Sequence, residues 1–372
     1  MLDATTFKDV VSGRRRGAAA SLARSVLRIA EAPYTFAVRR RNLRFDSGRA
    51  EIVRVGVPVV SIGNLTLGGT GKTPMVEWTA RWFLERGIRV AIVSRGYGAT
   101  DGQSNDEARE LAARLPDVPH VQNRDRVAAA REAIDHYGAG AIVVDDGFQH
   151  RRLARDLDVV LVDATEPFGF DHVFPRGTLR EPIESLRRAQ VAVLTRADLV
   201  SPQHREEIRQ RALAIAPHLD WIESTHTPRE LVNAAGQHRD LAWLAGRKIA
   251  AFCGIGNPAA FVQTLDSCGV AVDDFAAFPD HFDYTARRRG DTPILSQLSQ
   301  WAKSLSANAL VATCKDIAKI PHIHLDGIPL WALAVDLNFS VNREALEQRL
   351  ATLLPPPPPD PRPPPHDSRQ AR

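Results

Sequence analysis

The stretch Gly68-Gly69-Thr70-Gly71-Lys72-Thr73 decides the fold of this chain. A short apolar run at 57–63 precedes it, and a segment from Pro74 to Glu85 with apolar residues at helical spacing follows it. Strand, glycine-rich loop and helix in this order predict a phosphate-binding P-loop. Glycines let backbone N–H groups crowd around phosphate oxygens, and the start of the helix presents its positive dipole end to the same anion. The stretch therefore predicts a nucleotide-binding domain on a buried parallel sheet.

Two side chains of this loop are expected to bind different parts of a magnesium nucleotide. Lys72 can reach the β- and γ-phosphates of a nucleotide, and the Thr73 hydroxyl can bind Mg²⁺. The common pattern has glycine where this chain has Thr66, so a glycine-rich turn without a ligand is the alternative interpretation. We expect the nucleotide to be held by Thr66, Leu67, Gly68, Gly69, Thr70, Gly71, Lys72 and Thr73.

The composition describes an ordinary soluble protein of about two domains. Of 372 residues, 44% are apolar and 25% are charged, and no run of 18 apolar residues predicts a membrane span. The three cysteines lack metal-ligand spacing and predict reduced thiols in the cytosol. No secretory signal is visible, and the last eighteen residues, from Pro355, predict a disordered proline-rich tail.

The N-terminal 49 residues are basic and amphipathic. They hold eleven Lys or Arg and four Asp or Glu, a net charge of 11 − 4 = +7, whereas the whole chain carries +4. Leu22, Val26 and Ile29 share one helical face, arginine triplets lie at 14–16 and 39–41, and Pro33 is expected to end the helix. This pattern predicts a helix in a membrane interface, with an amphipathic helix packed on its own protein as the alternative. Nucleic acid is not expected, because no aromatic residues alternate with the arginines.

Further apolar runs complete an α/β pattern. Strands are expected at 90–94, 141–144, 159–163, 191–195, 249–253, 309–313 and 330–337. They predict a P-loop NTPase-type doubly wound parallel sheet with a second, smaller α/β domain. The expected units are a membrane-interface segment at 1–49, a P-loop kinase domain at 50–227, a C-terminal α/β domain at 228–354 and the tail at 355–372.

Several loops after these strands are candidate site segments. Asp145 and Asp146 follow the strand at 141–144, as a Walker B carboxylate does. Arg95 and Tyr97 follow another strand at the edge where α/β sheets bind ligands, although on spacing alone a simple turn is the favoured interpretation. The loop at 167–184 is a candidate substrate loop, and His281 lies between two carboxylates as a candidate base. Thr195-Arg196-Ala197-Asp198 loosely resembles a guanine-reading motif.

Seven motifs in order resemble the tetraacyldisaccharide 4′-kinases of lipid A synthesis, over residues 30 to 340. They are Ser61–Thr66 running into Gly68–Pro74, Ser94–Gly98, Asp125–Ala130, Asp145–His150, Leu179–Pro182, Gly254–Pro258 and Phe278–His281. The resemblance implies transfer of the γ-phosphate of ATP to the 4′-hydroxyl of a lipid A disaccharide 1-phosphate. It also implies Mg²⁺ and two α/β/α domains that are joined by a β-linker, with the site in the cleft between them.

The resemblance also implies roles for individual residues. Asp106, Lys72 and His281 would be catalytic, with Asp106 as the base, although Asn105 and Ala108 replace the flanking residues of the family pattern. Cys314 stands where the family has glutamate. The implied metal-binding residues are Thr73, Asp145, Asp146 and Glu181, and the implied substrate- or phosphate-binding residues are Arg95, Tyr97, Arg126, Gln149 and Arg180.

The resemblance further implies work at the cytoplasmic face of the inner membrane, and the short arginine-rich N-terminus predicts peripheral attachment there. Two alternatives stay open. One is a P-loop GTPase or metal-insertion chaperone, and the other is a membrane-surface scaffold with a degenerate nucleotide site.

Overall fold

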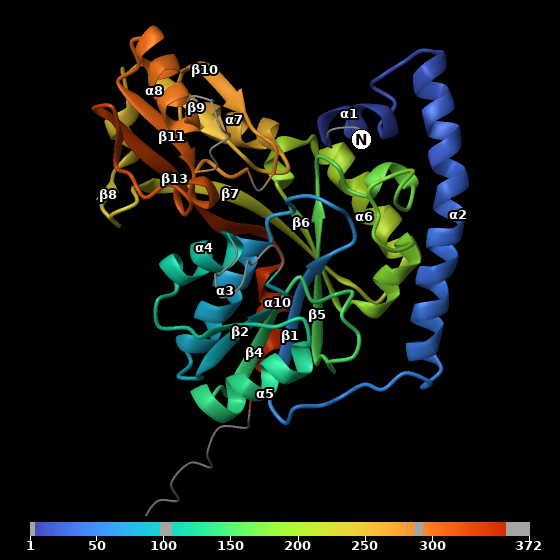
Figure 1. Cartoon of the computed structure of the whole chain (residues 1–372). Coiled ribbons are helices and arrows are strands. Elements are labelled where there is room, and N and C mark those ends of the chain that lie inside the picture. The colour runs from blue at the N-terminus through green and yellow to red at the C-terminus, as the bar shows by residue number, and fades with distance from the viewer. Residues whose placement is uncertain (1–3, 97–105, 281, 286–292, 355–372) are drawn as a thin grey trace, which may run out of the picture.

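One continuous mixed sheet organises the molecule (Figure 1). The computed structural model describes residues 4–96, 106–280, 282–285 and 293–354. The strand order is β10-β9-β11-β13-β7-β6-β5-β1-β4-β2-β3, with β12 beside β13 and β8 beside β7. The strands are β1 Val59–Asn64, β2 Val90–Ser94, β3 His120–Gln122, β4 Ala141–Asp145, β5 Leu157–Asp163, β6 Val191–Thr195, β7 Asp220–Val232, β8 His238–Arg239, β9 Ile249–Cys253, β10 Val272–Ala277, β11 Ala309–Thr313, β12 His324–Leu325 and β13 Ile328–Val341.

The first half of the sheet, from β3 to the start of β7, is parallel and covered on both faces. Its central strands are apolar and fully buried, as strands with helices on both sides must be. The helices α3 (Lys72–Leu84), α4 (Asp106–Arg114) and α10 (Arg343–Ala351) cover one face, and α5 (Arg126–Tyr137) and α6 (Pro202–Ile215) cover the other. The predicted doubly wound P-loop fold is confirmed.

The second half is a smaller α/β unit in which β9, β10, β11 and β13 are parallel. The helices α8 (Ile294–Ser304) and α9 (Cys314–Ile317) lie on one face, and α7 (Pro258–Ser267) lies on the other. Short 3₁₀ turns lie at Gly169–Asp171, Ile183–Arg188, Ala197–Leu199 and Leu241–Leu244.

Strand β7 joins the two halves and reverses the sheet. Its first residues pair in parallel with β6, and its remainder pairs antiparallel with β13, from Glu223 opposite Val341 to Val232 opposite Ala332. The strands of the second half therefore run opposite to those of the first. Residues at or after the carboxyl ends of β1, β4, β9 and β11 line one cavity.

Two boundaries differ from the sequence-based expectation. The second unit was expected to begin near 228, but that position lies inside β7, whose polar middle section hides the strand pattern. The unit was also expected to extend to 354, yet α10 returns to the first half, where Leu346 and Leu350 share a core with Met75 and Phe83. Figure 1 shows α10 beside the strands of that half.

The N-terminal segment forms α1 (Ala4–Val11) and a long helix α2 (Ala18–Asp46) along one side of the molecule (Figure 1). The expectation that Pro33 ends the helix was wrong, because the helix continues for thirteen residues beyond it. Contacts on both sides of the proline compensate for the lost hydrogen bond: Glu31 binds the backbone N–H of Val173, and Asn42 binds Glu181. Within the described residues, no helix combines the length and apolarity needed to cross a membrane.

Candidate active site

The predicted P-loop forms the floor of a large cavity. Gly68 and Gly71 have φ values of 113° and 81°, a backbone region that residues with a Cβ rarely adopt, and Gly71 is the N-cap of α3. Residues Leu67 to Thr73 all line a cavity of about 870 Å³. Thr66 does not line it, since its side chain is buried and its backbone pairs with Leu179. The structure thus gathers seven of the eight predicted nucleotide-binding residues around one space.

The last residue of β6 and the residue after it hold the P-loop by hydrogen bonds to its backbone. Thr195 Oγ1 donates to the carbonyl of Thr70 at 3.0 Å, and Arg196 Nη1 donates to the carbonyl of Gly69 at 3.0 Å and forms an ion pair with Asp163. In a trans peptide the following N–H points opposite to its carbonyl, so the N–H groups of Thr70 and Gly71 turn toward the cavity. The segment that resembled a guanine-reading motif therefore supports the loop.

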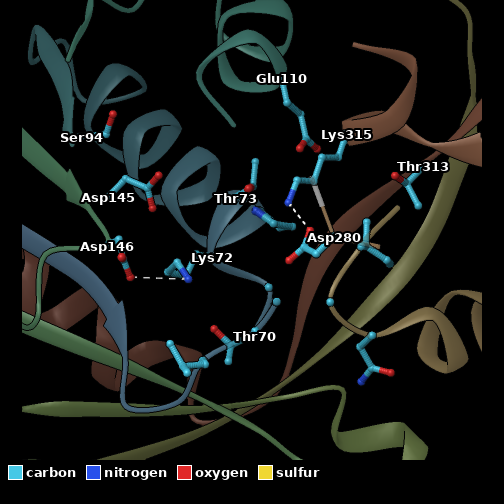
Figure 2. A pocket seen from close by; sticks show the side chains of 18 of the residues that line it. Thr70, Lys72, Thr73, Ser94, Glu110, Asp145, Asp146, Asp280, Thr313 and Lys315 are labelled. Atoms are coloured by element: carbon cyan, nitrogen blue, oxygen red, sulfur yellow. Dashed lines mark hydrogen bonds and ion pairs between the residues drawn. The ribbon is translucent and has the colours of Figure 1, made fainter. Parts of the chain in front are cut away.

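The two aspartates after β4 differ in environment. Asp145 is 3% exposed, whereas Asp146 lies 3.6 Å from Lys72 and 2.7 Å from Arg180. Burial alone would raise the pKa of the Asp146 carboxyl, but the charges of Lys72, Arg180 and Arg126 together lower it to about 2. Asp146 is therefore ionised at neutral pH and holds Lys72 close to the phosphate loop. Figure 2 shows the ion pair between Asp146 and Lys72.

Three further predicted residues, Arg95, Arg126 and Gln149, line the cavity beyond the aspartates. Asp125 caps α5 by accepting from the N–H of Val127 at 2.9 Å, which sets Arg126 at the first helical position. Gln149 donates to the carbonyl of Asn64 at 2.8 Å, next to the P-loop strand. The structure therefore brings these side chains into the same cavity as the phosphate loop.

The helix α2 closes this end of the cavity. Tyr34, Val38 and Arg41 line it, while Tyr34 Oη donates to the carbonyl of Arg180 at 3.2 Å and Arg41 donates to the carbonyl of Gln149. The same helix therefore borders the site with one face and leaves the other face exposed.

The opposite wall comes from the C-terminal half, and it includes Gly256 and Asp280 from two of the motifs that carried the family resemblance. It comprises Ile255, Gly256, Asn257, Ala260, Phe261, Thr264, Asp280, Thr313, Cys314, Lys315, Leu333 and Val335. A Cβ on Gly256 would lie 2.8 Å from the backbone nitrogen of Gly69, so glycine is required where this wall meets the P-loop. The rule that ligands bind at the carboxyl ends of strands would have pointed to this wall, because β9 and β11 end there.

Cations predominate in the lining, which suits a polyanionic ligand. The acidic residues are Glu110, Asp145, Asp146 and Asp280, and the basic residues are Arg41, Arg95, Arg114, Arg124, Arg126, Arg180, Arg196, Lys72 and Lys315. Arg114 is engaged by Glu77 at 2.9 Å and Glu110 at 3.2 Å.

Some predicted residues are not placed in the cavity. Glu181 was expected to bind metal, but it is 1% exposed and is absent from the lining. Arg188 at 2.9 Å, Ser185 at 2.8 Å and Asn42 at 2.9 Å hold its carboxylate behind the cavity wall, so the structure does not support a metal ligand there. Tyr97 and His281 lie outside the described residues, as does the side chain of Asp106, although the backbone of Asp106 begins α4.

Comparison with known proteins gives a consistent result. Residues 23–355 match the sequence profile of a family described as tetraacyldisaccharide-1-P 4′-kinase. The tetraacyldisaccharide 4′-kinase of Anaeromyxobacter dehalogenans strain 2CP-C is 44% identical over 292 residues, which cover 73% of this chain and 76% of that protein. The one from Anaeromyxobacter sp. strain Fw109-5 is 36% identical over 92% of this chain and 95% of that protein. The crystal structure of LpxK from Aquifex aeolicus in complex with ATP has a TM-score of 0.69 and 26% identity, over 89% of this chain and 99% of that one.

Proposed function

This chain belongs to the tetraacyldisaccharide 4′-kinase family, and from that premise we propose how its residues perform the reaction. It is an ATP-dependent kinase that transfers the γ-phosphate to the 4′-hydroxyl of a tetraacyldisaccharide 1-phosphate, a lipid A precursor. One observation carries the proposal: a single cavity joins a P-loop to the inner face of a helix whose outer face is apolar and exposed. This arrangement suits a kinase with one soluble and one lipid substrate.

The P-loop binds the phosphates of ATP in this proposal. Its N–H groups and Lys72 contact the β- and γ-phosphates, and α3 directs its positive dipole end at them. Lys72 is the charge that follows the γ-phosphate during transfer, and Asp146 holds it in position at 3.6 Å. Since phosphoryl transfer needs positioning and electrostatic stabilisation more than covalent help, these fixed donors supply most of the catalysis.

The residues around Lys72 fit a bound Mg²⁺. Thr73 and the buried Asp145 both line the cavity and offer the hydroxyl and carboxylate oxygens that this ion prefers. Asp146 is engaged by Lys72 and Arg180, so we assign Thr73 and Asp145 as the residues that would hold the ion. When bound there, Mg²⁺ neutralises charge on the phosphate oxygens.

The acceptor hydroxyl needs a base as its bond to phosphorus forms. We assign this role to Asp106, with His281 as its partner. The segments that carry both residues border the cavity, because α4 contributes Glu110 and Arg114 to the lining and Asp280 immediately precedes His281. Arg95, Arg126, Gln149 and Arg180, together with Tyr97, would orient the disaccharide phosphate.

The outer face of α2 supports peripheral attachment to the cytoplasmic face of the inner membrane. Leu22, Val26, Ile29, Phe36 and Leu43 are between 56% and 76% exposed and fall on one stripe of the helix. An apolar stripe flanked by arginines is the pattern of a helix that lies in a membrane interface. Acyl chains of the substrate can then stay in the bilayer while the sugar reaches the cavity past Tyr34, Val38 and Arg41.

The proposal is tested by phosphorylation of tetraacyldisaccharide 1-phosphate in detergent micelles with labelled ATP. The wild-type enzyme should form product with Mg²⁺ and lose activity when EDTA removes the ion. Lys72→Ala should lower kcat/KM by about a thousandfold, since a positioned charge on the transferred group is removed. Near-normal turnover of Lys72→Ala, or product formation in excess EDTA, would contradict the assigned roles. GTP in place of ATP should support little reaction.

A further inference from the structure

The wall opposite the P-loop carries a lysine that the reaction described above does not use. Lys315 lies in α9, directly after β11, and lines the cavity together with Asp280. Its Nζ atom is 2.8 Å from Asp280 Oδ1, and its side chain is 15% exposed. Figure 2 shows its amino group pointing into the cavity on the side of Thr73, with Asp280 beside it.

The backbone beneath this lysine is held firmly. Asp316, the next residue, is 0% exposed and accepts hydrogen bonds from the N–H of Gly254 at 3.0 Å and from Tyr284 Oη at 3.0 Å. Its second oxygen lies 2.6 Å from Thr313 Oγ1 at the end of β11. These contacts fix α9 to the loop after β9. Lys315 is therefore displayed from a rigid support, as a positioned catalytic group must be.

The same support is close to the phosphate loop. Gly256, in the loop after β9, approaches the P-loop so closely that a Cβ there would lie 2.8 Å from the nitrogen of Gly69 and 3.3 Å from Asp280 Oδ2. The carboxylate that pairs with Lys315 is thus a near neighbour of the phosphate-binding backbone. A cation at this place faces the same ligand as Lys72, but from the other half of the sheet.

We propose that Lys315 is a second phosphate-binding cation, which contacts the γ-phosphate of ATP from the side opposite Lys72. Negative charge spreads over three equatorial oxygens of the phosphoryl group during transfer, and the P-loop side can contact only some of them. A lysine on a flexible four-carbon stem can exchange its carboxylate partner for a phosphate oxygen without a change in protonation. Asp280 holds the charge until the nucleotide arrives. The inference rests on the proposed function for the identity of the reaction.

The test compares nucleotides that differ by the γ-phosphate. Binding of ADP and of the β,γ-methylene analogue of ATP is measured by calorimetry for the wild-type protein and Lys315→Met. The variant should bind the analogue about tenfold more weakly and ADP within about twofold of wild type. Lys303→Met is the matched control, because Lys303 lies in the same half and is paired with Asp326 at 3.2 Å on the surface.

Several outcomes would overturn the inference. One is that Lys315→Met binds the ATP analogue as tightly as wild type does. The other is that it keeps the wild-type unfolding temperature but loses affinity for ADP and for the analogue by the same factor. If Lys315→Met fails to fold, Lys315→Arg must keep analogue binding within about threefold of wild type. Asp280→Asn tests the alternative that Lys315 acts only by holding that carboxylate. If Asp280→Asn loses as much of the preference for the ATP analogue over ADP as Lys315→Met does, direct contact between Lys315 and the phosphate is contradicted. No lipid is present in these measurements, so failure of the proposed acceptor chemistry would leave this test unaffected.

Discussion

His226 links a single side chain to the shape of the P-loop. It lies in β7, and a Cβ on Gly71 would be 2.9 Å from its imidazole ring. Its Nε2 atom is buried and, within the described part of the chain, has no hydrogen-bond partner. Burial, helped by the charge of Arg196, lowers its pKa to about 3. The ring is therefore neutral at physiological pH and packs against the turn that begins α3.

This burial predicts a pH dependence of stability. Because the folded pKa lies below the ordinary value of about 6.5, the unfolded chain takes up the proton first and stability falls as pH drops below 6.5. Between pH 7 and pH 5, His226→Gln should lose less unfolding free energy than wild type, by on the order of 1 kcal/mol. Urea unfolding at both values measures this. His204→Gln, on the exposed part of α6, should behave as wild type, and equal losses in all three proteins would contradict the argument.

Gly256 gives a second prediction for one residue. An added Cβ would meet the backbone nitrogen of Gly69, which cannot move without changing the phosphate loop. Gly256→Ala should weaken ATP binding by about tenfold or more, because small misplacements of binding groups have large effects. Gly140→Ala is the control, since its Cβ would meet Ile88 at an ordinary 3.5 Å. Equal ATP affinity in the two variants would show that the loop after β9 does not press on the P-loop.

Among secondary-structure elements, α2 has two faces with different tasks. Its inner face binds the body through Glu31, Tyr34 and Asn42, whereas its outer face exposes the apolar stripe that contains Leu22 and Ile29. The sequence pattern predicted this stripe correctly. It could not predict that the helix passes Pro33, because the contacts that support the second part of the helix come from residues about 140 positions away.

The double variant Leu22→Glu/Ile29→Glu tests the outer face. Both side chains are exposed, so the unfolding temperature should change little. Each large aliphatic side chain contributes about 1.5–3 kcal/mol when it is transferred from water to an apolar phase, so binding to anionic vesicles should weaken at least tenfold. Vesicle sedimentation measures the loss. Tyr137→Glu, which adds a charge at an exposed position on α5, is the control. Unchanged sedimentation of the double variant would place the attachment elsewhere.

The strands illustrate what sequence patterns can resolve. Buried apolar runs such as Val90–Ser94 and Val191–Thr195 were predicted with correct bounds, because burial on both faces gives a continuous apolar signal. Strand β7 was missed because most of its length pairs with β13 in a ribbon between the halves, where its side chains are alternately covered and exposed. Because the sequence alone does not show the pairing with β13, the polar residues of β7 have the composition expected of a linker.

For the whole molecule, the reversal at β7 and β13 creates the site. It turns the strand ends of the second half toward the P-loop, so that Lys315 and Asp280 border the same cavity as Lys72. Sequence motifs marked the P-loop wall, because its chemistry depends on consecutive residues. The opposite wall is assembled from four separate segments, and the topology of the sheet brings them together. Glu181 shows the limit of a motif, since the sequence marks the residue but does not show that Arg188 contacts one oxygen of its carboxylate outside the cavity lining.

The central claim is that this cavity transfers phosphate from ATP to one hydroxyl of a lipid-anchored disaccharide. Its most direct test is to incubate the purified full-length protein with ATP, Mg²⁺ and tetraacyldisaccharide 1-phosphate and to locate the new phosphate by ³¹P and ¹H NMR. The account predicts one new phosphomonoester, on the 4′ position, with the 1-phosphate unchanged. Phosphate at another position, or ATP hydrolysis without a phosphorylated lipid, would contradict it.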